Sequence, residues 1–137
     1  MKIKKILLAG VAVTVFNTIV GMVTCGGLFS WVYALEPTNV WRPMQGPPGL
    51  GFFIGSYLLS VIFAYTYVLL QKGIPGKSKI ERGLTFGFCV WAVGMLPGMF
   101  ATSSFMTVAT TVVLYWTIMG LIQTPIQGII TAYICEE

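Results

Sequence analysis

The charged residues of this 137-residue chain lie in four short stretches, and their spacing constrains the fold more than any other feature. There are twelve of them, and charge-free runs of thirty, twenty-nine and fifty-three residues separate the stretches. A helix needs roughly 20 apolar residues to cross a bilayer core about 30 Å thick. The first two runs, Lys5 to Glu36 and Arg42 to Lys72, therefore hold one span each, and the run that ends at Glu136 holds two.

We expect an all-α fold, an integral membrane four-helix bundle in a single domain over residues 1–137. The expected spans are about 6–26, 50–71, 83–101 and 106–134. Apolar residues make up 56% of the chain and charged residues 9%, with a mean hydropathy of +0.85. A soluble domain carries about 25% charged residues, so this chain cannot cover a water-facing surface.

The basic residues predict the orientation of the spans. Seven of them precede the first span or follow the second, whereas Arg42 alone lies in the first connection. The positive-inside rule places both termini and the middle connection in the cytoplasm. We expect a multi-pass protein of the inner (plasma) membrane. Because these residues flank spans and form no long stripe, no nucleic-acid partner is expected.

The N-terminus has a second interpretation. Its lysines, the apolar run and Cys25 imitate a secretory signal or a lipoprotein signal. Thr24 stands where a lipoprotein cleavage site needs a small Gly, Ala or Ser, and three further apolar spans follow. We therefore expect the segment to remain as the first span. Beyond about Thr24 the helix either protrudes or breaks at Gly26–Gly27, which places Trp31 and Tyr33 at the interface.

Glycine pairs four residues apart predict where helices pack closely, because small residues let backbones approach. One pair opens the second span, and two follow each other in the third at an offset of eleven, close to three helical turns. The helix-packing candidates are Gly51, Gly55, Gly83, Gly87, Gly94 and Gly98. We expect the third span to present one continuous glycine face to another helix. Pro97 should kink or end that helix, and residues 101–104 should form a hairpin.

The fourth span carries the most polar intramembrane residues. Gln123 and Gln127 share one helix face around Pro125, and Thr107 and Thr111 stand near its start. Hydrogen bonds between helices are one interpretation, and a polar lining for a small permeant or ligand is the other. These four residues are the candidate lining.

The first connection, residues 36–49, holds four prolines and two glycines, so neither helix nor sheet is expected there. Trp41 and Arg42 lie in its middle. They predict an interfacial anchor held by a Glu36–Arg42 ion pair, or a docking surface for a partner, since Trp and Arg dominate interface hot spots. Both can hold together.

Missing residue types argue against catalysis. The chain has no His and no Asp, and its three cysteines show no C-x-x-C spacing. Haem ligation, zinc chemistry, acidic proton relays and nucleophilic triads all need residues that are lacking here. We expect no enzymatic activity, no metal and no cofactor.

Aromatic and glycine positions resemble a known group of proteins. These are Trp31-Val32-Tyr33, Gly83-Leu84-Thr85-Phe86-Gly87, Trp91, Tyr115-Trp116, Gly120 and Gly128. In them the chain looks like small bacterial four-span proteins grouped as domains of unknown function. The resemblance implies a four-helix membrane bundle and brings no catalytic or binding residues.

Two function classes remain. The first is a non-catalytic accessory or structural subunit that packs against other membrane-protein subunits or copies of itself in the bilayer. The second is a small solute or ion transporter or channel that acts as an oligomer. A lipid-binding role for the basic middle connection is a weaker third hypothesis.

Overall fold

The computed structural model describes residues 2–43 and 46–136, and it confirms an all-α bundle. Four helical segments are long and apolar enough to cross a membrane: Lys2–Leu28, Leu50–Leu70, Lys79–Phe105 and Thr110–Cys135. The elements are α1 (Lys2–Val23), the π-helical turn η1 (Thr24–Leu28), the 3-10 helix η2 (Ser30–Ala34), α2 (Leu50–Leu70), α3 (Lys79–Val90), the π-helical turn η3 (Trp91–Met95), α4 (Leu96–Phe105) and α5 (Thr110–Cys135).

The third span differs from its prediction at both ends. The third span begins at Lys79, where Ser78 caps it by accepting a hydrogen bond from the Glu81 N–H at 3.2 Å. The hairpin predicted at 101–104 is helical, and the turn lies at 106–109. Thr102 and Ser104 donate their hydroxyl protons to helix carbonyls one turn earlier, at 2.9 Å each, so these polar residues continue the helix.

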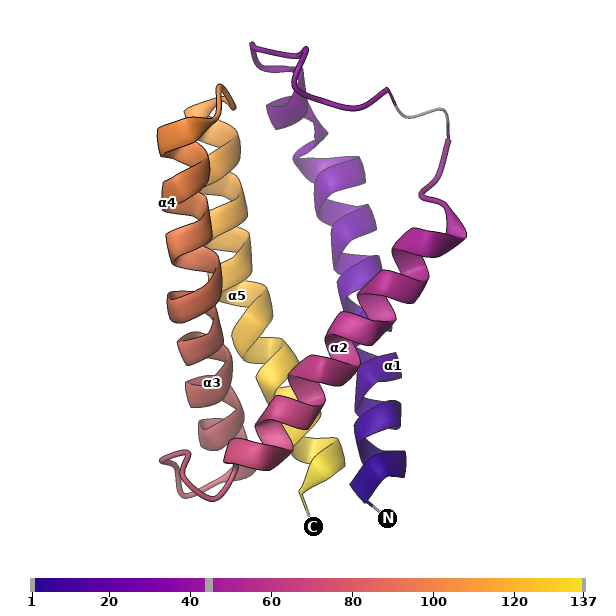
Figure 1. The fold of residues 1–137 in the computed structure, drawn as a ribbon, viewed down its shortest axis with the longest axis vertical. Helices are drawn as coiled ribbons and strands as arrows, with labels where there is room; N and C mark the ends of the chain where they lie inside the picture. Colours follow the sequence, from indigo (N-terminus) through magenta and orange to yellow (C-terminus); the bar gives the residue numbers. More distant parts are fainter. Residues whose placement is uncertain (1, 44–45, 137) are drawn as a thin grey trace.

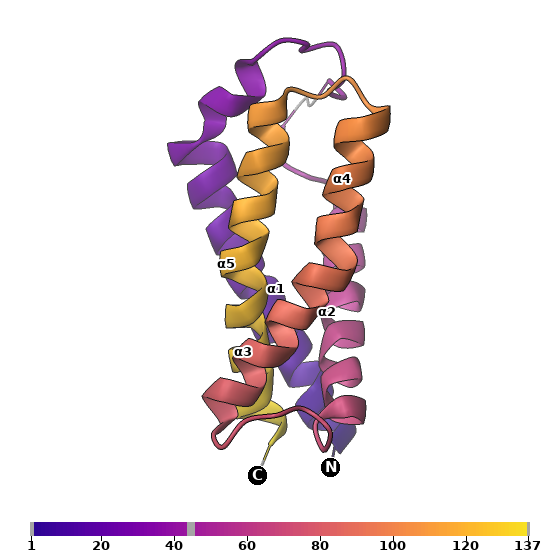
Figure 2. The same cartoon turned by 90° about the vertical axis from the view of Figure 1, so that its left-hand side faces the viewer.

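Helix α5 is the centre of the arrangement. It packs along α3 and also contacts α1, α2 and α4, while α1 and α2 cross each other (Figure 1). The third span changes direction between α3 and α4 (Figure 2). Both described ends of the chain lie at the same end of the bundle as the α2–α3 connection (Figure 1). We call this the terminal end and the other the loop end.

The buried core is small and divided. One cluster near the terminal end centres on Tyr67, Phe86 and Ala132. Another at the loop end centres on Val32 and Tyr115. Many large apolar side chains are exposed on the outer surface, and bilayer hydrocarbon is the solvent that such side chains match.

The first helix neither breaks at Gly26–Gly27 nor ends at Thr24. It continues through the π-helical turn η1 to Leu28, and the chain then enters η2. Trp31 is exposed and Tyr33 half-buried.

Candidate functional site

Gly83 and Gly87 form a close backbone contact with another helix, as the sequence predicts. A Cβ atom on Gly83 would lie 2.6 Å from the Ile129 Cα and 2.7 Å from the Gly128 carbonyl oxygen. A Cβ on Gly87 would lie 2.7 Å from the Pro125 nitrogen and closer still to neighbouring backbone atoms. All of these atoms belong to the backbone of α5, so only glycine fits at either position.

The other four predicted packing glycines make no such contact with the described residues. Within that part of the chain, no neighbouring atom lies within 4 Å of a Cβ built on Gly51, Gly55, Gly94 or Gly98. For the third span the cause is η3, which begins after the first pair and contains Gly94 of the second pair. A π-helical turn places about one extra residue in the helix, and each residue turns the face by about 100°. The prediction of one continuous glycine face on that span is therefore wrong.

Two close approaches were missed from the sequence. A Cβ on Gly120 would lie 3.2 Å from the Trp91 ring and closer to Met95, so large side chains of η3 fill the space above this glycine. A Cβ on Gly10 would lie 2.5 Å from Val61, where α1 crosses α2. Neither glycine has a partner four residues away, so the spacing rule could not find them.

A cavity of about 310 Å³ lies between α1, α2 and α5. Its polar wall consists of Asn17, Thr18, Ser56, Ser60 and Gln127, and we call it the polar cleft. The Gln127 amide donates to Asn17 Oδ1 at 2.7 Å. In the adjoining packing, the Thr14 hydroxyl donates to Ser60 Oγ at 3.0 Å. The cleft thus joins polar side chains that are far apart in the sequence.

The predicted lining does not come together as one surface. Gln127 lines the polar cleft, but Gln123, Thr107 and Thr111 are not among the residues around it. Thr107 lies in the turn before α5, and both threonines are exposed at the loop end. Residues of α1 and α2, above all Asn17 and Ser56, complete the cleft instead.

The loop containing Trp41 and Arg42 is held to the helices through Trp41, and its role as a docking surface stays a prediction. Trp41 is half-buried against the loop-end core, and its ring centroid lies 5.3 Å from that of Tyr33 and 5.9 Å from that of Trp116. Arg42 is exposed. The predicted Glu36–Arg42 ion pair is absent from the described structure, in which Glu36 accepts a hydrogen bond from the Thr38 N–H at 3.2 Å. Trp41 therefore anchors the loop to this chain's own helices.

Hydrogen bonds connect this aromatic packing to Cys25. The Trp116 Nε1–H donates to the Tyr33 hydroxyl at 2.8 Å, and that hydroxyl donates to Cys25 Sγ at 3.5 Å. The Tyr115 hydroxyl lies 3.4 Å from the same sulfur. Burial and the bond to Cys25 raise the pKa of Tyr33 to about 12, so its phenol stays protonated at neutral pH. The group ties η1 and η2 to α5.

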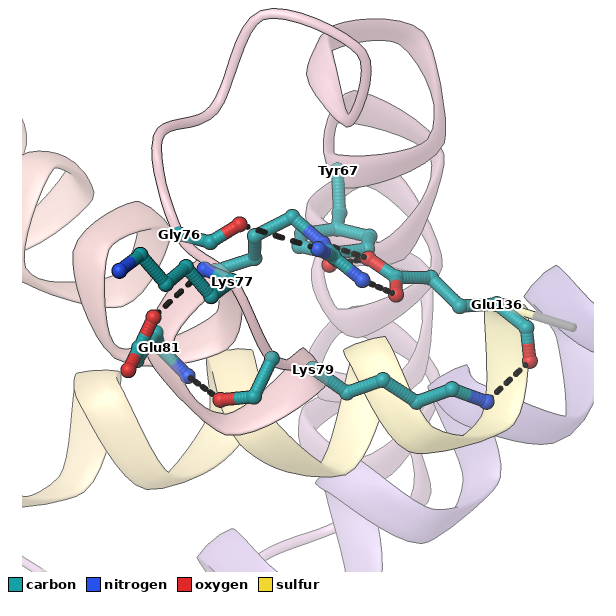
Figure 3. Close-up of polar contacts among 8 residues, drawn as sticks. Tyr67, Gly76, Lys77, Lys79, Glu81 and Glu136 are labelled. Carbon is teal, nitrogen blue, oxygen red and sulfur yellow. Dashed lines mark hydrogen bonds and ion pairs between the residues drawn. The ribbon is translucent and has the colours of Figure 1, made fainter.

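An ion-pair network closes the terminal end (Figure 3). Arg82 donates to Glu136 through Nε at 2.9 Å and through Nη2 at 2.5 Å, and the Tyr67 hydroxyl also donates to that carboxylate. Lys79 Nζ donates to the Glu136 backbone carbonyl at 2.9 Å. The hydrogen bonds from Arg82 lower the pKa of Glu136. This network joins the C-terminal end of α5 to the start of α3 and to the end of α2.

A second cavity, of about 410 Å³, lies beside this network and is lined by lysines of the N-terminus and the middle connection. Arg82 and Glu136 belong to its wall, so part of its charge is already paired. Across residues 2–43 and 46–136 no group of three or more His, Cys, Asp or Glu side chains is placed to hold a metal ion.

Comparisons with protein-family models, curated proteins and solved structures give no match for this sequence. The resemblance to small bacterial four-span proteins therefore stays a prediction.

Proposed function

We propose that this chain is a non-catalytic subunit that assembles inside the membrane through its glycine-bearing helix faces. The observation that carries the proposal is the contrast between two sets of glycines. The backbone of α5 occupies the space where a Cβ on Gly83 or Gly87 would lie, whereas no neighbouring atom of the described residues lies within 4 Å of a Cβ built on Gly51, Gly55 or Gly98. In a bilayer, such small residues allow a second backbone to approach.

The surroundings of these open glycines support an intramembrane partner. On α2, Phe52 and Leu58 beside them are 60% and 55% exposed, and on α4 Phe100 is 73% exposed. A partner helix lying against α2 or α4 would find a shallow glycine depression bordered by large apolar side chains. The partner is a helix of a larger membrane subunit or of a second copy of this chain.

We infer the orientation from charge. The N-terminus and the basic middle connection lie at the terminal end, and the connection between α1 and α2, which contains Arg42, lies at the loop end. The bias supports an inner-membrane protein whose termini are cytoplasmic. The resemblance to four-span bacterial proteins agrees with this location and adds no activity.

The alternative, a small transporter or channel acting as an oligomer, draws on the polar cleft. Its specific support is that the cleft is uncharged and lined from three helices. Thr107 and Thr111 are not among the described residues that line it, so they do not extend its polar wall.

Gentle-detergent purification followed by native mass spectrometry tests the assembly. We expect a homo-oligomer or a stoichiometric larger partner, and Gly55→Leu or Gly98→Leu should release the monomer without lowering its melting temperature. Gly21→Leu is the matched control, because Gly21 also has nothing within 4 Å but lies outside the paired glycines. A wild-type chain that purifies as a monomer without any partner contradicts the proposal.

A further inference from the structure

The polar cleft contains hydrogen-bonding groups that the protein does not use. The bond between Gln127 and Asn17 occupies Asn17 Oδ1 and one N–H of Gln127. In the described part of the chain, Asn17 Nδ2 and Gln127 Oε1 make no hydrogen bond of their own. A primary amide has two donor hydrogens and a carbonyl acceptor, so a donor and an acceptor remain side by side.

Depth and charge limit what can use these groups. Among the described residues, no charged side chain lines the cleft. Asn17 follows Lys5 by twelve residues, which is about 18 Å of helix and brings it near the middle of a hydrocarbon core about 30 Å thick. A charged headgroup at that depth, without a counter-charge, would be strongly unfavourable. The occupant is therefore uncharged.

The rim of the cleft indicates the direction of entry. Phe52, Leu59 and Phe63 complete its wall, and Phe52 and Leu59 are 60% and 69% exposed on the outside of α2. Figure 1 shows α2 diverging from α1 toward the loop end, beyond their crossing. A molecule can thus reach the cleft sideways from the bilayer while its apolar chains stay among the lipids.

We propose that the polar cleft binds the headgroup of a neutral membrane lipid with a free hydroxyl, of the diacylglycerol type. A hydroxyl both donates and accepts, so it can accept from Asn17 Nδ2 and donate to Gln127 Oε1. Without such a partner these amide groups would stay unsatisfied in hydrocarbon, at a cost of several kcal/mol each. This site does not depend on the assembly proposed above.

Photolabelling tests the site. The full-length protein is reconstituted in phosphatidylcholine vesicles with a diacylglycerol that carries a diazirine in one acyl chain. We expect saturable labelling of residues around the cleft, suppressed by unlabelled diacylglycerol but not by the same lipid with its hydroxyl methylated. A cleft that holds only water gives no hydroxyl-dependent labelling, and that result overturns the proposal.

Variants locate the label. Ser56→Leu fills the cleft but leaves the Asn17–Gln127 bond intact, and Asn17→Leu removes the donor. Each should reduce labelling at least about fivefold, the effect of losing one or two hydrogen bonds. Gln123→Leu is the control, because it also replaces a polar side chain by leucine, on α5 but outside the cleft. Unchanged labelling in Ser56→Leu at a wild-type melting temperature, or an equal loss in Gln123→Leu, contradicts the assignment.

Discussion

Replacing Gly87 by alanine isolates the packing energy of the α3–α5 contact. Ordinary carbon contacts are about 3.5–4.0 Å, whereas the new Cβ would lie 2.7 Å from the Pro125 nitrogen, so α5 must move by roughly 1 Å. Overpacking of this kind costs about 1–3 kcal/mol. Alanine also favours the helix over glycine by about 1 kcal/mol, which opposes the packing cost. Gly21→Ala gains the same propensity in α1 and meets no atom within 4 Å.

The difference between the two variants cancels the propensity gain and leaves the packing cost. We expect Gly87→Ala to melt roughly 3–10 °C below Gly21→Ala, since 1 kcal/mol corresponds to a few degrees in a chain of this size. The assay is a thermal unfolding curve of the detergent-solubilised monomer at one protein concentration. Equal melting temperatures would falsify the reasoning, because they would mean that the backbone contact adapts without cost.

Three further predictions concern the terminal end and the topology. The pKa of Glu136 is lower in the folded state than its ordinary value of 4.5. The ionised carboxylate therefore stabilises the fold at pH values above 4.5, and this stability is lost as the pH falls through the lower folded-state pKa. The melting temperature of the wild type should therefore fall on acidification below about pH 4.5. The uncharged variant Glu136→Gln should have a lower melting temperature at pH 7 and should lack this part of the pH dependence. Ser78→Ala removes a helix cap and should cost about 0.5–2 kcal/mol in the same assay, whereas an unchanged melting temperature would show that the cap is dispensable. In a cysteine-free background, an impermeant thiol reagent on intact cells should label Trp41→Cys and spare Lys77→Cys; the reverse pattern contradicts the inferred orientation.

The spans could be predicted because charge and hydropathy act over long windows. Any charge-free run of membrane length must satisfy its backbone hydrogen bonds internally, so helices over such runs follow directly from the sequence. Their ends could not be placed so well. At 101–104 the side-chain hydroxyls donate to helix carbonyls, but the same hydroxyls could also hydrogen-bond to the backbone of a turn. The residue types alone therefore do not distinguish a helix from a turn.

The candidate sites were predicted only where one helix carries the whole pattern. Gly83 and Gly87 lie within a single regular helix, so the prediction that they share one packing face was correct. The extension to Gly94 failed because the spacing rule assumes an unbroken α-helix and η3 is not one. The polar cleft is assembled from three helices, and no periodicity within α5 could pair Gln127 with Asn17.

The placement of both described chain ends at one end of the bundle has a consequence for linked copies of this protein. If Glu136 of one copy is joined to Lys2 of the next through a short polar linker, both halves insert with the same orientation and no extra span is needed. Such a tandem can reproduce a parallel arrangement of two bundles but never an antiparallel one. The same geometry means that a duplicated and fused gene of this design would yield eight spans in direct repeat rather than an inverted one.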